Sequence, residues 1–307
     1  MSNPDVRPDP TGDRDAGHGD AGRTAARTVS VLTHGRPTHA AEALRSLVRE
    51  AADAGVELWF DPDETAKHDL RPAPGIVVDQ PWRADADLCV VLGGDGTILR
   101  GLRRHVGTGV PVFAVNLGEI GFLATVEPAD ADAGLRDALA GRFEVLPLPS
   151  LQLCLPDGTI HDGINDLSVH RRSGERVAAL RYSVDDEEVG FVRCDGLVVA
   201  TPAGSTGYNL ANGGPVLAWG VEGYAVSFIA PHTLSARSLV VAPEGTLRLH
   251  NASPSAVELG VDGRPQGLLQ PDEAITVAFR REAALLAQTP GSSFYRRLRE
   301  KFGRLAE

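Results

Sequence analysis

The chain has 307 residues, of which 42% are hydrophobic and 23% are charged, a composition that excludes wholesale disorder and is ordinary for a globular protein. This length suggests two domains or one large one. Because 30 Lys and Arg face 41 Asp and Glu, the formal charge is −11, which argues against a general nucleic-acid or anionic-membrane binder.

The first part of the chain alternates strand-like and helical patterns. Residues 1–27 are rich in Asp, Gly, Pro and Arg and are predicted to be a disordered tail. The apolar run at 87–92 is typical of a strand buried on both faces of a parallel sheet, so we predict an α/β domain over residues 28–142. The predicted strands are 28–33, 56–60, 87–92 and 110–115, and the predicted helices are 40–54 and 98–106.

From about residue 143, short strand-like runs follow one another with turn signals and little helix. This pattern predicts an all-β sandwich domain over residues 143–288. The segment 289–307 carries four large apolar residues on one helical face, and we expect it to pack back on the body rather than on a membrane. The predicted strands are 144–155, 166–170, 179–184, 196–201, 225–230, 239–242, 246–250, 257–261 and 274–279.

Cysteine usage and the chain ends indicate a cytoplasmic protein. Cys89, Cys154 and Cys194 lie far apart without a CxxC spacing, which argues against a disulfide framework or a zinc site. We expect each to be a small buried side chain. No apolar run reaches the ~18–20 residues of a membrane span, and the N-terminus lacks a hydrophobic signal segment.

The segment Leu92-Gly-Gly-Asp-Gly-Thr97 follows the buried strand. Three glycines let the backbone approach a ligand, and the N–H groups that begin the next helix can hold a phosphate. Asp95 would stand at the carboxyl end of a parallel strand, where it suits a general base or a Mg²⁺ contact. Arg100 could reach a phosphate, with a plain surface arginine as the alternative. The spacing of a Walker A loop or a GxGxxG fingerprint is absent.

Two shorter segments belong beside this loop. Residues 116–124, NLGEIGFLA, follow another parallel-type strand, and Gly118 and Gly121 permit a tight turn next to the first loop or a packed interdomain turn. Asn165 and Asp166 open a strand and offer a donor and an acceptor suited to vicinal ribose hydroxyls, although an Asx turn would use the same residues.

The segment 195–215 runs from a strand into a loop rich in Gly, Ser and Thr that carries Tyr208. Hydroxyls, free backbone N–H groups and one ring suit a loop wrapped around a nucleotide base and its phosphates. Ser205 lacks the GxSxG context of a serine hydrolase. The spacing of the histidines matches no metal-ligand motif.

In this order, GGDGT, NLGxxGFLA, the Asn-Asp pair and DGLVVATPxGSTxY resemble the NAD kinase family over about residues 28–302. The resemblance implies transfer of the γ-phosphoryl of ATP, or of a polyphosphate terminus, to the 2′-hydroxyl of the adenosine ribose of NAD, giving NADP. It also implies a divalent metal, usually Mg²⁺, a homodimer or homotetramer, and an α/β domain followed by a β-sandwich NAD-binding domain.

Carried over residue by residue, the resemblance implies that Asp95 is the proton acceptor. Asn165 and Asp166 resemble the pair that grips the NAD ribose, and Asp195 resembles a carboxylate that binds the nicotinamide half. Arg193 and Arg264 are weaker candidates for basic contacts. The implied NAD-binding residues are Asp95, Gly96, Arg100, Asn165, Asp166, Arg176, Asp195, Thr206, Gly207, Tyr208, Asn209, Leu210 and Ala211.

The loop within segment 195–215, which we call the adenosine loop, departs from the commoner family pattern at three positions. Ala203, Gly207 and Ala211 stand where Thr, Ala and Ser are frequent. Two alternatives remain open. A lipid kinase of the diacylglycerol or sphingosine type shares GGDGT but should lack the adenosine loop, and a non-catalytic NAD(P)-binding regulator could use the same fold.

Overall fold

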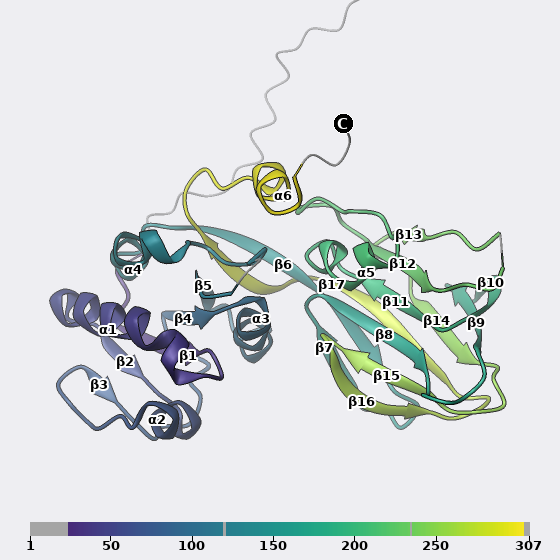
Figure 1. Cartoon of the computed structure of the whole chain (residues 1–307), viewed down its shortest axis with the longest axis horizontal. Coiled ribbons are helices and arrows are strands. Elements are labelled where there is room, and N and C mark those ends of the chain that lie inside the picture. Colours follow the sequence, from purple (N-terminus) through teal and green to yellow (C-terminus); the bar gives the residue numbers. More distant parts are fainter. Residues whose placement is uncertain (1–23, 119–120, 234, 304–307) are drawn as a thin grey trace, which may run out of the picture.

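The computed structural model describes residues 24–118, 121–233 and 235–303, which form two lobes connected by two long strands (Figure 1). Most of the predicted disordered tail, residues 1–23, lies outside the described residues. Ala26 is already buried, and its N–H donates to the carbonyl of Leu139 at 2.9 Å. The packed chain therefore includes residues just before the predicted first strand.

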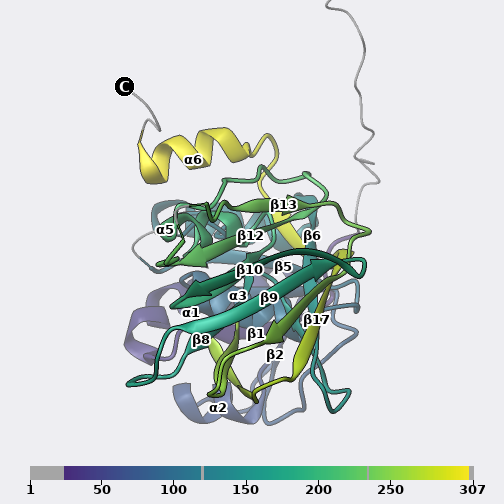
Figure 2. The ribbon, with the colours of Figure 1, turned by 90° about the vertical axis from the view of Figure 1, so that its right-hand side faces the viewer.

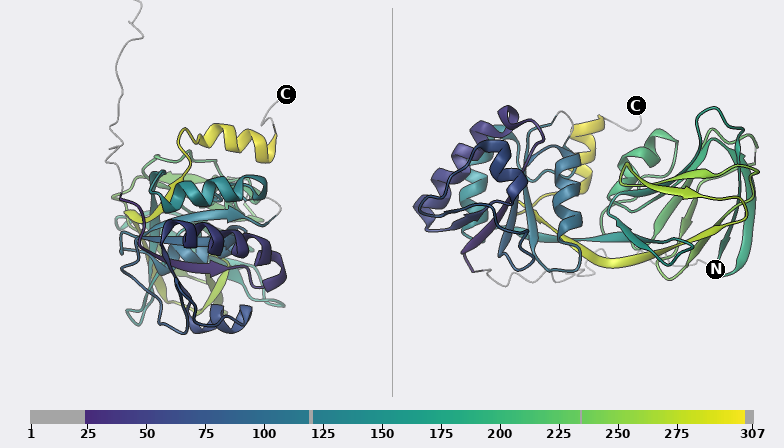
Figure 3. Two further views of the ribbon diagram at one scale, coloured as in Figure 1. Left: turned by 90° about the vertical axis from the view of Figure 1, so that its left-hand side faces the viewer. Right: turned by 90° about the horizontal axis from the view of Figure 1, so that it is seen from below.

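The N-terminal lobe is a parallel sheet with helices on both faces. Its elements are β1 Thr28–Thr33, α1 Pro37–Ala54, β2 Glu57–Trp59, α2 Pro62–His68, β3 Ile76–Val77, β4 Leu88–Gly93, α3 Asp95–Arg104, β5 Pro111–Asn116 and α4 Ala131–Leu139. The strands hydrogen-bond in the order β5, β4, β1, β2, β3. Along β4, Val90 and Leu92 belong to the core that includes α1 and α4, whereas Cys89 and Val91 belong to the core that includes α3. The helices lie on both faces of the sheet (Figure 3). Covering both faces explains the unbroken apolar run of this strand.

The C-terminal lobe is a sandwich of two β-layers. Its elements are β6 Glu144–Cys154, β7 Ile160–Gly163, β8 Asp166–Arg171, β9 Ala178–Val184, β10 Glu187–Cys194, β11 Gly196–Ala200, α5 Tyr208–Ala211, β12 Tyr224–Ile229, β13 Leu239–Val241, β14 Leu247–Asn251, β15 Val257–Val261, β16 Arg264–Leu269 and β17 Ala274–Gln288. One layer has the order β13, β12, β11, β8, β15, β16, and the other contains β10, β9, β14, β17, β6 and β7. Alternate residues such as Leu197 and Leu249 fill the core between the layers.

The predicted fold class, an α/β domain followed by an all-β sandwich, is confirmed. Four strands of the described residues, β3, β7, β10 and β16, have no counterpart among the predicted segments. Strand β16 contains Pro265, and proline disfavours a strand because it lacks an N–H. It is tolerated here because β16 lies at the edge of its sheet.

Strands β6 and β17 run through both lobes (Figure 1, Figure 3). They pair antiparallel, with a register shift between Arg280 and Ala284. Beyond the shift, Leu285 and Leu286 pair in parallel with the first two residues of β5. The last third of β17 is therefore part of the N-terminal sheet, and a segment predicted as a short strand at 274–279 extends to Gln288.

Helix α6, Phe294–Phe302, follows β17 and lies above the junction of the lobes (Figure 1, Figure 2). Phe294 and Leu298 are buried in a cluster with Phe122, which Trp219 also contacts. No helix within the described ranges is long and apolar enough to cross a membrane.

The three cysteines are free. Cys89 and Cys194 are buried, as predicted, and burial raises the pKa of Cys89 to about 12 and that of Cys194 to about 11. Cys154 is only half-buried, so the prediction of a buried side chain is wrong there, because Cys154 ends β6 and its side chain lies near the rim of the sheet.

Candidate functional site

The candidate site begins at the point in the N-terminal sheet where the strand order changes direction. The chain adds β2 and β3 on one side of β1, and β4 and β5 on the other. The carboxyl ends of β1, β4 and β5 are Thr33, Gly93 and Asn116. Open α/β sheets bind ligands at such a switch point, and the GGDGT loop directly follows β4 there.

Asp95 is the first residue of α3. Its side chain is held by residues 121–124 of the loop that follows β5, which we call the second loop. Its carboxylate oxygens accept the N–H groups of Phe122 at 2.9 Å and Leu123 at 3.1 Å. The two loops touch so closely that a Cβ added to Gly94 would lie 3.3 Å from the Cα of Gly118. Glycine at these positions therefore lets the GFLA segment fix the orientation of the Asp95 carboxylate.

Asn116 shapes the second loop from the end of β5. Its Oδ1 accepts the N–H of Gly118 at 3.0 Å, and its Nδ2 donates to Glu127 at 2.9 Å. Gly121 has φ +51°, and a Cβ there would overlap the Asn116 amide at 2.3 Å. Gly118 and Gly121 both lie against Asn116, and Gly118 also lies against Gly94 of the first loop, whereas the tight turn predicted between them falls on residues outside the described ranges.

A pocket of about 640 Å³ lies between α3 and the sandwich. Leu99 brings α3 to its wall, and because Leu99 is four residues after Asp95, both lie on one face of the helix. The pocket contains Asn165, Asp166 and Tyr208, three of the predicted NAD-binding residues, together with Arg264. Its full lining is Leu99, Asn165, Asp166, Ser168, His170, Tyr208, Glu258, Leu259, Gly260, Asp262, Gly263, Arg264, Pro265, Gly267 and Leu268.

Asp262 holds the Asn-Asp pair in place. It lies in the turn between β15 and β16, and its carboxylate accepts the N–H groups of Ile164, Asn165 and Asp166 at 3.1, 2.7 and 3.2 Å. Arg103 of α3 donates to the same carboxylate at 3.0 Å. The Asp262 side chain has no exposed surface, so this one group joins the two lobes under the pocket.

Sequence reasoning did not single out Asp262. The only local signal is Asp-Gly between two apolar runs, which indicates a hairpin turn. Nothing in that signal shows that the carboxylate reaches backbone N–H groups nearly a hundred residues earlier in the chain.

Asp166 is buried at the pocket floor. Desolvation by burial and the nearby charge of Asp262 raise its pKa to about 7. A carboxyl group with this pKa can accept a hydrogen bond when charged or donate one when protonated, and both suit a ribose hydroxyl. The neighbouring Asn165 Oδ1 is buried and has no hydrogen-bond partner, so it is free to accept one from a ligand.

The adenosine loop packs directly on this pair. The N–H of Thr201 donates to the carbonyl of Asn165 at 2.9 Å, and a Cβ on Gly204 would lie 1.9 Å from the same oxygen. Tyr208 then stacks on His170, with 5.7 Å between the ring centroids and 19° between the planes. The loop therefore places an aromatic face at the pocket.

The remaining loop residues are placed around this stack. Thr206 is buried, and Gly207 precedes Tyr208 without lining the pocket. Asn209 is fully buried, and its Nδ2 donates to the carbonyls of Ser205 and Pro215, so it holds the loop closed. Leu210 and Ala211 complete α5.

The other predicted polar contacts lie outside the pocket. Arg100 donates to the carbonyl of Thr33 at 2.8 Å and pairs with the buried Glu64 at 3.2 Å. Asp195 pairs with Arg171 at 2.6 Å. Arg176 is exposed in the loop between β8 and β9. Gly96, in the first turn of α3, is exposed.

Positive charge gathers at the junction of the lobes. Arg264, exposed at the pocket, has its pKa lowered first by the charge of Arg103, and also by those of Arg100 and Arg104. Arg100, Arg103 and Arg104 are themselves paired with Glu64, Asp262 and Asp61, so the positive charge exposed at the pocket is that of Arg264. The predicted basic contact at Arg264 therefore lies where an anionic ligand could use it.

Among the described residues, no three His, Cys, Asp or Glu side chains lie close enough together to hold a metal ion. Mg²⁺ commonly binds through one or two carboxylates and the phosphates of a substrate. Asp95, the carboxylate at the helix N-terminus, fits that mode, so a cation would belong to the phosphate donor.

Known proteins share this architecture. The model of the ATP-NAD kinase N-terminal domain matches residues 60–143, and that of the ATP-NAD kinase C-terminal domain matches residues 164–289. A structure of yeast NADH kinase complexed with NADH, 24% identical, has the same fold with a TM-score of 0.84 over 93% of this chain and 90% of that one. The structure of an NAD kinase from Archaeoglobus fulgidus in complex with ATP is 27% identical, with a TM-score of 0.66 over 89% and 98% of the two chains.

Curated relatives agree with these matches. An NAD kinase from Symbiobacterium thermophilum is 38% identical over 230 residues, which cover 72% of this chain and 80% of the relative. One from Thermomicrobium roseum is 33% identical over 282 residues, or 91% of either chain. A lipid kinase is therefore not supported, and the chain belongs to the NAD kinase family.

Proposed function

We propose that the crevice between the lobes binds NAD with its adenosine ribose beside Asp95, and that Asp95 accepts the proton of the 2′-hydroxyl as ATP phosphorylates it. The observation that carries this proposal is the fixed Asp95 carboxylate, one helical turn from a pocket that holds Asn165, Asp166 and Tyr208. The chain is a phosphotransferase, as its family membership implies.

The reaction forms a bond between the ribose 2′-oxygen and the γ-phosphorus and breaks the bond between that phosphorus and the β,γ-bridging oxygen. ADP leaves with the bond's electron pair, and the hydroxyl proton passes to Asp95. A ribose hydroxyl is a weak nucleophile, and a positioned base contributes roughly 10²–10⁴-fold. Because both Asp95 oxygens are already held by N–H groups, the carboxylate needs no reorientation when the substrate arrives.

The rest of the site supplies binding and charge. Asn165 and Asp166 face the ribose hydroxyls, and Tyr208 offers a ring to the adenine. Arg264, exposed at the pocket, offsets part of the repulsion between a protein of charge −11 and a triphosphate. Asp95 is the carboxylate that would hold Mg²⁺ brought in with ATP, and the ion would supply positive charge to the transferring phosphoryl group.

The relatives solved with NADH and with ATP support a nucleotide acceptor and ATP as donor. Polyphosphate as donor and NADH as acceptor are the alternatives that an assay must separate. Assembly as a homodimer or homotetramer, a cytoplasmic location, the NAD contacts of Arg100, Arg176 and Asp195, and the domain division at residues 142 and 143 stay predictions.

The test is formation of NADP or NADPH by the purified full chain, read by an enzymatic cycling assay that detects both and neither NAD nor NADH. Four tubes combine NAD or NADH with ATP or polyphosphate, each with Mg²⁺, and a fifth contains NAD and ATP with EDTA. We expect the highest rate with NAD, ATP and Mg²⁺ and none with EDTA. If NAD binds but no tube yields a 2′-phosphorylated product, the chain is a non-catalytic NAD-binding regulator and the proposal is wrong.

A further inference from the structure

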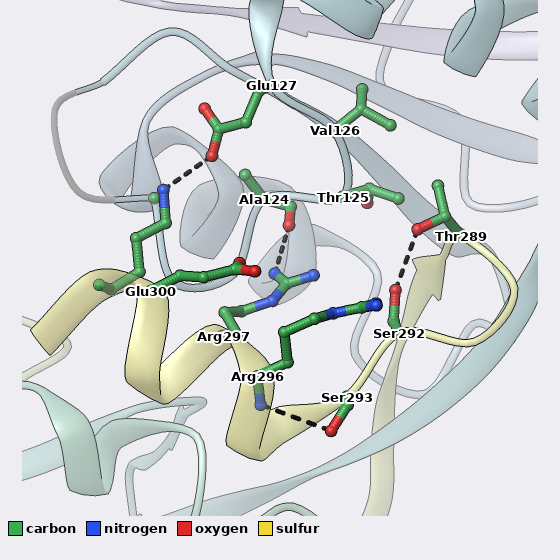
Figure 4. Close-up of a pocket in the computed structure, with 12 residues that line it drawn as sticks. Ala124, Thr125, Val126, Glu127, Thr289, Ser292, Ser293, Arg296, Arg297 and Glu300 are labelled. Atoms are coloured by element: carbon green, nitrogen blue, oxygen red, sulfur yellow. Dashed lines mark hydrogen bonds and ion pairs between the residues drawn. The ribbon is translucent and has the colours of Figure 1, made fainter. Parts of the chain in front are cut away.

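Arg297 of helix α6 reaches into the back of the loop that holds Asp95. Its Nη1 donates to the carbonyl oxygen of Ala124 (Figure 4) and to that of Phe122 at 2.8 Å, and its Nη2 donates to Gln288 at 2.7 Å. The guanidinium also lies 5.3 Å from the centre of the Trp219 ring. A side chain on the C-terminal helix thus binds a segment more than 170 residues earlier in the chain.

The segment 122–124 is hydrogen-bonded on both sides. The N–H groups of Phe122 and Leu123 hold the Asp95 carboxylate, while the carbonyls of Phe122 and Ala124 accept from Arg297. The peptide groups therefore lie between a carboxylate and a guanidinium. Burial lowers the pKa of Arg297, and the charge of Asp95 opposes that shift, as expected for two opposite charges close to each other.

A second contact from α6 steadies the start of the loop. Lys301 donates to Glu127 at 2.7 Å, and Glu127 accepts from Asn116 at 2.9 Å. Asn116 in turn accepts the N–H of Gly118, whose Cα lies against Gly94. Both ends of the second loop are therefore connected to the same helix.

The helix itself is anchored across the lobes. Phe294 and Leu298 pack with Phe122 of the N-terminal lobe, and Trp219 of the C-terminal lobe contacts Phe122 and Phe294 edge-on at 5.6 and 5.5 Å. With its apolar face fixed in this way, α6 presents Arg297 toward the loop. The Nη groups of Arg297 donate to two backbone carbonyls of the loop and to Gln288, so its hydrogen bonds link α6 to that loop and to the end of β17.

We infer that Arg297 is a positioning residue for phosphoryl transfer, which holds the Phe122–Ala124 carbonyls so that the N–H groups of that segment aim the Asp95 carboxylate at the ribose hydroxyl. This inference rests on the proposed role of Asp95. Because a misplacement of about 1 Å can cost 10²-fold in rate, loss of Arg297 lowers kcat while leaving the pocket that binds NAD intact.

The first measurement compares Arg297→Gln with Arg299→Gln. Arg299 is exposed on the same helix, so its replacement removes the same charge without touching the loop. We expect Arg297→Gln to lower kcat by about 10- to 100-fold with the NAD dissociation constant changed by less than about 3-fold, and Arg299→Gln to match the wild type. Arg297→Lys, which keeps the charge and can reach one carbonyl, should recover part of the lost kcat.

A double-mutant cycle with Asp95→Ala separates positioning from general damage. If Arg297 acts through Asp95, adding Arg297→Gln to Asp95→Ala lowers the residual kcat by less than about 2-fold. Equal losses in both backgrounds, or an unchanged kcat for Arg297→Gln, would overturn the inference. If instead Asp95→Ala alone keeps full activity, the proposed role of Asp95 fails, a result distinct from either. Should Arg297→Gln not fold, the cycle is run with Arg297→Lys.

Discussion

Replacing Asp262 with alanine tests whether one buried carboxylate joins the lobes under the pocket. The substitution leaves the N–H groups of Ile164, Asn165 and Asp166 without their acceptor and removes the ion-pair partner of Arg103. The Asp262 side chain is fully buried and that of Arg103 is 16% exposed, so water screens the interaction little.

The expected loss follows from these partners. Breaking a buried ion pair by removing one member costs about 3–5 kcal/mol, and unaccepted buried N–H groups cost about 1–3 kcal/mol each. Water from the adjoining pocket can satisfy the freed N–H groups, whereas the ion pair is buried, so we expect a total of about 3–5 kcal/mol, which is the cost of breaking the ion pair. For a protein of this size that corresponds to a fall in Tm of roughly 10 °C.

The free energy of unfolding should be measured by denaturant titration at pH 6. At that pH Asp166, whose pKa is about 7, is mostly protonated and uncharged. Removing Asp262 then relieves little charge repulsion with Asp166, so no such gain masks the loss of unfolding free energy. Asp272→Ala is the matched control, because Asp272 is an exposed turn residue with φ 64° beside the 47° of Asp262. A cost for Asp262→Ala within about 1 kcal/mol of the control would refute the reasoning.

Two further changes probe the pocket. Burial and Asp262 raise the pKa of Asp166 from 3.8 to about 7, so the folded state favours the protonated form, and stability from this group is present below pH 4 and lost as the pH rises through 7. Asp166→Asn should therefore gain stability relative to the wild type across that window, by up to about 4 kcal/mol, whereas a difference independent of pH would contradict the assignment. In Gly204→Ala the new Cβ would meet the carbonyl of Asn165 at 1.9 Å, so we expect a loss of about 1–3 kcal/mol and a raised KM for NAD. Gly207→Ala, where the nearest atom is 3.4 Å away, serves as its control for stability, and equal Tm values for the two variants would contradict this packing.

Local patterns were enough to predict the parts of the fold that depend on neighbouring residues. The apolar run of β4 and the glycines around Asp95 predict a buried parallel strand and a loop at its carboxyl end, and both are present. The Asn-Asp pair and Tyr208 likewise meet in one pocket, because β8 and β11 are hydrogen-bonded neighbours and the adenosine loop follows β11 directly.

The contacts that join distant segments could not be predicted in this way. The local sequence indicates only that Asp262 is a turn residue and that Arg297 is one of several basic residues on a short helix. In the structure both side chains bind backbone groups of the site. The pairing of Arg100 with Glu64 of α2 likewise has no local signal in the sequence, and the phosphate contact of Arg100 stays a prediction. The continuation of β17 past Arg280 depends on β5 and β6, which supply its partners, and not on its own composition.

The central claim is that Asp95 accepts the proton of the ribose hydroxyl, and the kcat of Asp95→Asn tests it most directly. The control is Asp63→Asn, which removes an exposed carboxylate from the first turn of another helix. NADP formation from NAD and ATP with Mg²⁺ should fall by at least about 100-fold in Asp95→Asn, with NAD still bound, and should be unchanged in the control. An Asp95→Asn variant that binds NAD and retains more than about a tenth of the wild-type kcat would contradict the account.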